Sequence, residues 1–450
     1  MLVDDLRAGV LTGLVFALSA CSNSKSGPLP KKDEPRDARP DSGELYLGLS
    51  TPSDGFQLRS IGAEIGPGDE REYCEVARLP GGPGDVYDVS SIELANGKNS
   101  HHLALAVVSP GSSAEAAVIA LGVGNRQECP GPSIQFGEGA EVVATIQHPY
   151  GETKLPDGVA WQYTGGQYIV YDYHYANTGL DTLDARSAVN FHLMDSSDVQ
   201  HIARTFFLNN LTLDTPPGKT ASFTAECHFD ADMMVGAFTR HTHHFGTDFS
   251  VWYAGGANDG QEIWTSHDWQ NETDYTFTAP ALVKAGEGFR YQCTYDNTTT
   301  SDLRFGTSIK DEMCMLYGPA WSAHDGDTPL EGCNITWIDD AGIGHPANEA
   351  GGFPKPSASD AATCQTFFGS AINDCNKCRC DSCATPLLKC GTDADCAPLL
   401  VCYANCADAA CIENCSSLLH DHSSGEGTLT SVIACSVQEC PICGAQTGTP

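Results

Sequence analysis

Short apolar runs follow one another along residues 45 to 345, with polar breaks between them. The runs are rich in Val, Ile, Tyr, Phe and Thr, and Gly, Pro, Asn or Asp interrupt them, as in YIVYDYHYANTG (168–179) and FRYQCTYDNTT (289–299). Such runs predict β-strands joined by turns, and we find no long helical periodicity in this region. We therefore predict antiparallel β-sandwiches, and about three hundred residues suit two of them better than one.

The C-terminal part of the chain has a different pattern, in which cysteines recur at helical spacing. In CAPLLVCYANCADAACIENC, Cys402 and Cys406 are four residues apart, as are Cys411 and Cys415. Each pair would lie on one face of a helix, and two such helices could be joined by two disulfides. A metal cluster built from CNKCRCDSC and CPIC is the alternative.

These patterns predict an all-β fold with a small additional module. The expected architecture is two consecutive antiparallel, jelly-roll-like β-sandwich domains, followed by a disulfide-rich and partly helical C-terminal module. The predicted segments are a lipoprotein-type signal peptide (1–20), a disordered tether (21–44), two sandwich domains (45–197 and 198–345), a linker (346–362) and the cysteine-rich module (363–450).

An apolar run near the N-terminus is typical of an export signal. The stretch AGVLTGLVFALSAC is too short to span a membrane and ends in Leu18-Ser19-Ala20-Cys21, which is similar to a bacterial lipobox. Cleavage before Cys21 would leave a lipidated cysteine as the first residue. We therefore expect an extracytoplasmic lipoprotein, in the periplasm or on the cell surface, that meets the membrane only through its lipid, or otherwise a secreted protein.

Charge and cysteine content narrow the possible functions. The chain has 58 acidic and 24 basic residues, a net charge of -34, which argues against a nucleic-acid partner because phosphates are neutralised by Lys and Arg. Without Cys21, an even number of the 21 cysteines remains, and they fall into a core group and a C-terminal group. In an oxidising compartment this density indicates disulfides first and metal thiolates second.

Histidines gather in three motifs, and a fourth motif carries a methionine. The motifs are RHTHHFG with His241 and His243, NSHHLALAVV with His101 and His102, YDYHYANTG with His174, and DEMCMLY with Met313. Residues two apart on a strand point the same way, so His241 and His243 could bind one ion. Adjacent residues point to opposite faces, so His101 and His102 could share an ion only if the strand ends or bulges there. Taken singly, each residue could instead be a surface or core residue.

The order and spacing of these motifs resembles the copper type II, ascorbate-dependent monooxygenases, the family of peptidylglycine alpha-hydroxylating monooxygenase and dopamine beta-monooxygenase. The resemblance covers roughly residues 45 to 340 and includes KLPDGVAWQYTGG (154–166). It implies that the two sandwiches are the N- and C-terminal copper domains of such an enzyme. It also implies disulfides between Cys74 and Cys129, Cys227 and Cys333, and Cys293 and Cys314.

The resemblance further implies two copper ions per chain, carried by separate domains. An electron-storing site would consist of His101, His102 and His174, and an oxygen-binding site of His241, His243 and Met313. Imidazole suits copper in both oxidation states, and a thioether favours Cu(I), whereas zinc gains little from a thioether. The expected reaction hydroxylates an unactivated C–H bond with dioxygen and an external electron donor, ascorbate or another reductant.

The positions that would bind substrate depart from the family pattern. Peptide-hydroxylating members have Arg two residues before His-Thr-His, Asn two residues after the methionine and Tyr four residues after it; this chain has Thr239, Met315 and Tyr317. Tyr317 is therefore our candidate catalytic residue, and Arg240 should lie on the opposite face of the strand. Asp172 replaces a Gln of the peptide enzyme, so the route between the coppers should differ. Whether the substrate is a small molecule or a peptide is left open.

Two other functions fit the same residues. The chain could be a non-catalytic extracytoplasmic copper-binding protein on the same scaffold, or a disulfide-stapled surface module with incidental histidines. Oxygen uptake coupled to product formation would exclude the first alternative, and two bound coppers would exclude the second. His244 is expected to lie beside the site rather than to bind the metal.

Overall fold

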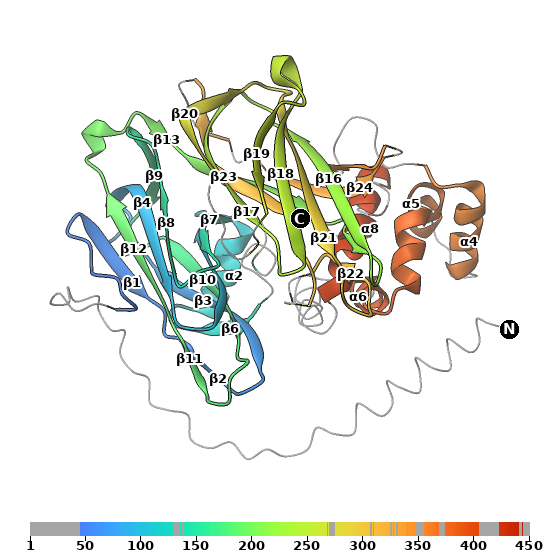
Figure 1. The fold of residues 1–450 in the computed structure, drawn as a ribbon, viewed down its shortest axis with the longest axis horizontal. Helices are drawn as coiled ribbons and strands as arrows, with labels where there is room; N and C mark the ends of the chain where they lie inside the picture. The colour runs from blue at the N-terminus through green and yellow to red at the C-terminus, as the bar shows by residue number, and fades with distance from the viewer. Residues whose placement is uncertain are drawn as a thin grey trace. The chain divides into compact units, whose positions relative to one another are not determined.

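The computed structural model describes most of the chain beyond residue 45. The described residues are 46–129, 136, 139–267, 269, 275–306, 308, 310–324, 326, 328–329, 332–339, 341–346, 355–368, 374–404, 423–440 and 443. Strands predominate up to residue 346 and helices from residue 358 onward, as the ribbon in Figure 1 shows. The predicted all-β class with a disulfide-rich C-terminal module is confirmed.

The first sandwich consists of two sheets. The six-stranded sheet has the order β1 (Gly55–Arg59), β12 (Ser187–Leu193), β4 (Val86–Asn96), β9 (Val159–Thr164) and β13 (His201–Ile202), with β8 (Tyr150–Lys154) paired to β4. The five-stranded sheet has the order β6 (Arg126–Glu128), β3 (Glu70–Arg78), β10 (Tyr168–Ala176), β5 (Ser100–Val108) and β7 (Ala140–Ile146). A short pair, β2 (Ala63–Ile65) and β11 (Leu183–Ala185), extends this domain. The pairings are antiparallel except that β13 runs parallel to β9.

The five-stranded sheet is covered on both faces. Its inner face packs on the main core with Leu103, Leu105 and Tyr171, and its outer face packs Val76 and Val170 under helix α2 (Ser113–Leu121). This helix is a finding that the sequence analysis missed. Its nine residues are too few for a strong periodicity, although the Ser112 side chain caps its first turn by accepting a hydrogen bond from the backbone N–H of Glu115.

The second sandwich is one ten-stranded sheet that folds over on itself. Its order is β19 (Glu262–Ser266), β18 (Gly246–Ala254), β21 (Gly288–Asp296), β16 (Thr220–His228), β25 (Ile343–Pro346), β24 (Gly332–Ile338), β14 (Arg204–Asn210), β23 (Met315–Ser322), β17 (Met233–His241) and β20 (Tyr275–Val283). A separate pair joins β15 (Asp214–Thr215) and β22 (Leu303–Arg304). Phe238 on β17 and Phe289 on β21 are far apart in this order, yet their ring centroids are 4.8 Å apart, so the sheet closes around an aromatic core.

Residues of both sandwiches contact each other along β7 and β23. The Glu141 carboxylate accepts a hydrogen bond from Nε of Arg204 at 2.6 Å. Trp321 of β23 packs into the core of the first sandwich. The chain passes from one sheet system to the other between Ile202 and Arg204, and the boundary at 197/198 stays a prediction.

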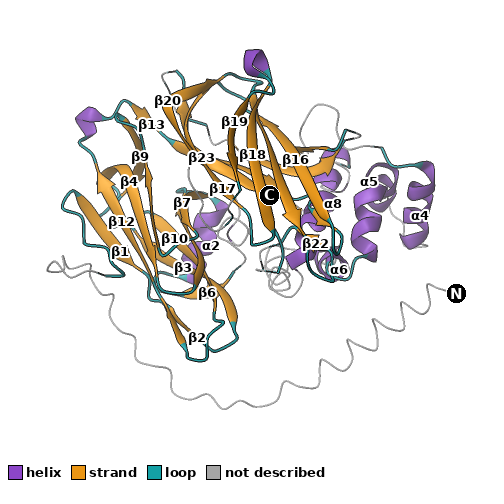
Figure 2. Cartoon of the chain, in the orientation of Figure 1, coloured by secondary structure: helices purple, strands orange, loops and turns teal. Residues whose placement is uncertain are grey.

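The C-terminal module is helical and cross-linked, as the cartoon in Figure 2 shows. Its helices are α4 (Ala358–Phe368), α5 (Asp374–Thr392), α6 (Cys396–Ala404) and α8 (Glu426–Glu439). Its disulfides join Cys364 with Cys380, Cys375 with Cys443, Cys378 with Cys440, Cys383 with Cys435 and Cys390 with Cys396. The cysteines proposed for a metal cluster are therefore used in disulfides. Cys402 is disulfide-bonded on α6, whereas Cys406, Cys411 and Cys415 lie outside the described residues.

The N-terminal predictions fall outside the part that the structure describes. Residues 1–45, including Cys21, are not among the described residues, so the signal peptide, lipid anchor and tether stay predictions. None of the described helices combines the length and the apolar character that crossing a membrane requires.

Candidate metal centre

A row of polar side chains crosses the outer face of the five-stranded sheet. His174 on β10 lies opposite Glu72 on β3 and opposite His102 on β5. Directly opposite residues in an antiparallel sheet share a face, as do residues two apart along one strand. Asp172 and Glu70 therefore belong to the same face as this row. The row places two histidines and three carboxylates next to the part of the face that α2 covers.

A bulge adds His101 to this group. The register between β10 and β5 shifts after His174, so that Tyr175 lies opposite Ser100 and His101 is the extra residue. This agrees with the expectation that the strand must end or bulge at the histidine pair. The nearest ring nitrogens of His101, His102 and His174 all lie within 4.8 Å of one another.

The three histidines each have a buried ring nitrogen that lacks a hydrogen-bond partner. These atoms are Nε2 of His101, Nδ1 of His102 and Nδ1 of His174. The other nitrogen of His174 is 3.0 Å from Oε1 of Glu70. Nε2 of His102 is 3.6 Å from carboxylate oxygens of both Glu72 and Asp172. Because a buried polar atom without a partner costs free energy, these three atoms fit a bound cation.

The second histidine pair lies where β17 ends. His241 is the last residue of β17, and the turn that follows is fixed by the buried carboxylate of Glu312. This carboxylate accepts hydrogen bonds from the backbone N–H of His243 at 2.8 Å and of Phe245 at 2.7 Å. Nδ1 of His243 is 2.8 Å from the carbonyl oxygen of Asp311, and its Nε2 is buried without a partner. Glu312 thus orients the histidine turn, a role that the motif alone did not indicate.

Met313 lies in a restrained segment next to this turn. Its side chain is buried in the second core. The Tyr295 hydroxyl donates a hydrogen bond to the Met313 carbonyl at 2.7 Å, and the adjacent Cys314 is bonded to Cys293. These restraints hold Met313 within the segment that contacts His243 through Glu312 and Asp311. Coordination by the thioether stays a prediction.

The remaining core cysteines also pair as the resemblance implies. Cys74 is bonded to Cys129 and Cys227 to Cys333. The first bond joins β3 to the segment after β6, and the second joins β16 to β24. The first bond therefore braces β3, which carries Glu70 and Glu72, and the second cross-links strands within the ten-stranded sheet.

The two histidine sets meet in the structure. The ring centroids of His101 and His243 are 5.2 Å apart, and those of His102 and His241 are 6.0 Å apart. The sets come from different sandwiches, and their rings form one continuous cluster. The separation of the sets depends on how the sandwiches pack, which local sequence patterns do not encode.

The sequence did not predict that Thr145 on β7 and Gln147 just after it contact the second sandwich, at Tyr317 and at His241. Nε2 of Gln147 is hydrogen-bonded to Nδ1 of His241. The hydroxyl groups of Thr145 and Tyr317 also share a hydrogen bond. The available sequence signal was a polar residue, Gln147, at the end of an apolar edge strand. That signal does not identify the partner, because His241 lies in the other sandwich.

The positions expected to meet substrate lie on two faces of β17 and β23. Thr239 is paired with Tyr317 and Arg240 with Leu316. Tyr317 therefore lies on the same face as His241, two residues from Thr239. Arg240 is 2% exposed and lies on the other face, as its displaced position predicted. The catalytic role of Tyr317 stays a prediction.

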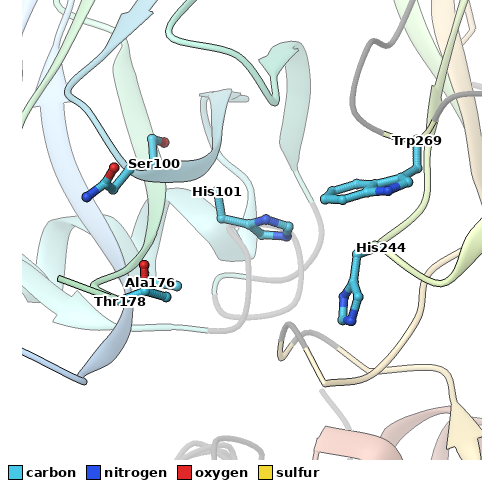
Figure 3. Close-up of a pocket in the computed structure, with 7 residues that line it drawn as sticks. Ser100, His101, Ala176, Thr178, His244 and Trp269 are labelled. Atoms are coloured by element: carbon cyan, nitrogen blue, oxygen red, sulfur yellow. The ribbon is translucent and has the colours of Figure 1, made fainter. Parts of the chain in front are cut away.

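A pocket of about 280 Å³ opens beside the histidine cluster. Asn99, Ser100, His101, Ala176, Thr178, His244 and Trp269 line it. Figure 3 shows the His101 ring directed toward the indole of Trp269 and the ring of His244. His244 is exposed, and its ring centroid is 6.0 Å from that of Trp269, which agrees with a position beside the site. Among the residues that the structure describes, the lining carries no Asp, Glu, Lys or Arg side chain.

Burial keeps four of the histidines neutral. It lowers the pKa of His101, His174 and His241, and lowers the pKa of His243 to about 3. Burial also lowers the pKa of His102, but the carboxylates of Asp172 and Glu72 outweigh it and raise that pKa to about 10. Neutral imidazoles are the form that binds metals, so the lowered pKa values favour metal binding by these four histidines.

The two β-sandwiches and the histidine cluster at their contact define a β-sandwich protein with a candidate metal centre. Residues 210–336 match the family model described as "Copper type II ascorbate-dependent monooxygenase, C-terminal domain". This stretch of the chain is therefore similar to the C-terminal domain of the copper type II, ascorbate-dependent monooxygenases. The matched residues include His241, His243 and Met313, whereas the first histidine set precedes them.

Two of the solved structures to which this chain is similar share little sequence with it. The STIV MCP has 7% identity and a TM-score of 0.27, with 59% of this chain and 97% of that chain covered. The glycosylasparaginase PNGase F from Flavobacterium meningosepticum has 8% identity and a TM-score of 0.27, with 62% and 98% covered. These similarities carry no argument about function.

Proposed function

We propose that this protein is an exported copper-dependent monooxygenase that hydroxylates an unactivated C–H bond. The reaction would use dioxygen and two electrons from an external one-electron donor, ascorbate or another reductant. One oxygen atom would enter the product alcohol, and the other would leave as water with two protons. The family match supports copper and monooxygenase chemistry, and the two-site mechanism is our inference.

The observation that carries the proposal is the convergence of buried, unpartnered imidazole nitrogens from both sandwiches. These nitrogens belong to His101, His102, His174 and His243. Four such atoms in one cluster would be costly unless a cation satisfied them. Imidazole is a good ligand for copper, and the thioether of Met313 would add a preference for Cu(I) at the second set.

Each histidine set would hold one ion. His101, His102 and His174 would hold an electron-storing copper, and His241, His243 and Met313 would hold an oxygen-binding copper. Bound copper supplies one-electron chemistry that activates dioxygen. The chain orients these ligands through Glu312 and Gln147, and the short distance between the sets gives the electron a short path.

The residues at the positions expected to meet substrate favour a substrate that is not held through a carboxylate group. Thr239 occupies the position of the family arginine, and Arg240 is buried on the other face. The pocket beside His101 offers hydroxyl, amide, imidazole and indole groups. We therefore propose a small, uncharged substrate over a glycine-extended peptide, with Tyr317 placed to contact it.

Copper analysis and product detection test the proposal together. The purified chain should bind about two coppers and should couple oxygen uptake with a chemical reductant to a hydroxylated product. Copper binding without coupled product would favour the non-catalytic copper-binding alternative. Failure to bind copper at the histidines would reject both. A His101→Ala, His243→Ala double variant is the matched control, since it removes one ligand from each set.

Export through Cys21 is a separate part of the proposal. The apolar run and LSAC sequence predict that the mature chain begins at a lipid-modified Cys21. Mass spectrometry of the N-terminal peptide should find this cysteine diacylated or triacylated. Retention of Met1, or a mature chain that begins well after Cys21, would contradict it.

A further inference from the structure

The two histidine sets differ in the groups that contact their outer ring nitrogens, which are the nitrogens directed away from the cluster. We propose that Glu70, Glu72 and Asp172 are positioning residues that make the first set prefer Cu(II), and so set the direction of electron transfer toward the second set. This inference rests on the proposed function, because it assumes that both sets hold copper. It concerns side chains that contact histidines and not the copper itself.

Carboxylates face the outer nitrogens of the first set. Glu70 is 3.0 Å from Nε2 of His174, and Glu72 and Asp172 are each 3.6 Å from Nε2 of His102. The pairing of β3, β10 and β5 fixes these neighbours, since Glu72, His174 and His102 lie directly opposite one another. Asp172 is 3% exposed at its side chain and Glu72 is 11% exposed, so water screens them little.

In the described contacts, Nδ1 of each histidine in the second set meets an uncharged group instead. Nδ1 of His243 meets the backbone carbonyl of Asp311, and Nδ1 of His241 meets the side-chain amide of Gln147. Both contacts orient a ring without adding a charge at the ring nitrogen. The two sets therefore use the same ligand type but differ in the carboxyl groups that lie behind it.

This difference has an electrostatic consequence. A negative charge behind a ligand stabilises Cu(II) more than Cu(I), because the interaction grows with the charge of the ion. Hydrogen bonding of a ligand imidazole to a carboxylate also raises its basicity, which favours the higher oxidation state. The first set should therefore release an electron readily. One electron would leave Cu(I) at the first set, which becomes Cu(II), and reduce Cu(II) at the second; the external one-electron donor of the proposed reaction would then restore the first.

The test measures the relative affinity for Cu(I) and Cu(II) at the first set alone. A full-length His241→Ala, His243→Ala background removes the second set, and Glu72→Gln, Asp172→Asn and Glu70→Gln are then introduced one at a time. We expect each change to raise the ratio of Cu(I) to Cu(II) affinity about tenfold. The Cu(II) electron paramagnetic resonance spectrum should shift as well. Glu128→Gln is the control, since this exposed carboxylate on neighbouring β6 pairs with Arg71 instead.

The outcomes separate this inference from the proposed function. Unchanged affinity ratios in all three variants, with copper still bound, would overturn the positioning role and leave the proposed function intact. Absence of copper from the background protein would reject the first metal site itself. Glu70 is 27% exposed at its side chain, so Glu70→Gln should fold even if the two more buried changes do not. Its result alone can then support or overturn the inference.

Discussion

Which ring nitrogen each histidine directs into the cluster determines how the cluster can bind an ion. His102 and His174 turn Nε2 toward carboxylates and leave Nδ1 for the cluster, whereas His243 turns Nδ1 toward a carbonyl and leaves Nε2. The partner of one nitrogen thus fixes which nitrogen is available. These orientations arise from strand pairing for the first set and from the Glu312 turn for the second. A ligand change at either set should therefore have a distinct signature.

Met313→Ile should remove the soft ligand from the second set. Hydroxylation should collapse, because Cu(I) loses its thioether, while the first set should still load. Copper stoichiometry and Cu(I) X-ray absorption would show this, since the sulfur scatterer should vanish. His174→Ala is the matched variant, in which the sulfur signal should persist although turnover stops. A wild-type Cu(I) spectrum without sulfur, or loss of both coppers in both variants, would contradict the two-site proposal.

Glu75→Gln should change how stability depends on pH. Burial raises the pKa of Glu75 to about 7, although the backbone N–H of Ile61 donates a hydrogen bond to it. A carboxyl with a raised pKa takes up a proton on folding, so its contribution to stability is lost as the pH rises from about 4.5 to about 7. The substitution should reduce the loss of unfolding free energy between pH 5 and 8 by about 2 kcal/mol.

Thermal or denaturant unfolding of the copper-free chain at both pH values would measure this effect. Glu128→Gln, with an exposed carboxylate, should leave the pH dependence unchanged. An identical pH dependence in wild type and Glu75→Gln would contradict the assignment.

At the scale of elements, β7 links one sandwich to the ligands of the other. It is an edge strand of the five-stranded sheet, so one side is open to contacts. Glu141 meets Arg204, Thr145 meets Tyr317, and Gln147 meets His241. The strand thereby couples domain packing to the orientation of a ligand histidine.

Gln147→Leu should weaken the second set without disturbing the first. The leucine has a similar length but cannot hydrogen-bond to Nδ1 of His241, so copper affinity at the second set should fall about tenfold. Titration with Cu(II), with the sites distinguished by electron paramagnetic resonance, would measure it. Gln162→Leu on the exposed side of β9 is the control. Equal affinity in Gln147→Leu and wild type would show that β7 does not orient the ligand.

The sequence predicted the strands better than it predicted which residues of the two sandwiches contact each other. Alternating apolar residues predicted the strands, and the His101–His102 pair predicted an irregularity that the structure shows as a bulge. The Gln147–His241 contact and the closeness of His101 to His243 could not be predicted. Both depend on packing between residues distant in sequence, which periodicity does not report. Helix α2 was missed for a different reason, since nine residues give a weak helical signal.

For the whole molecule, the C-terminal module packs on the second sandwich through charge and apolar contacts. Arg304 forms an ion pair with Asp393, and Nζ of Lys389 is 3.0 Å from Asp214. Trp337 of β24 packs against the Cys383–Cys435 disulfide. These contacts lie at β15, β22 and β24, so the described part of the module braces the sandwich that contains Met313.

Because the chain has a net charge of -34, the rate at which a reductant reduces the copper-loaded protein should depend on the reductant's own charge. Ascorbate is an anion at neutral pH, so the acidic protein should repel it, and salt should screen that repulsion. Raising the ionic strength from 0.01 M to 0.15 M, which shortens the Debye length from about 30 Å to about 8 Å, should speed reduction of the copper-loaded protein by ascorbate up to about tenfold. Stopped-flow loss of the Cu(II) signal would measure the rate. Hexaammineruthenium(II), a cation, should show the opposite trend, and neutral hydroquinone should change little. If salt slows ascorbate, a local cationic site must outweigh the net charge.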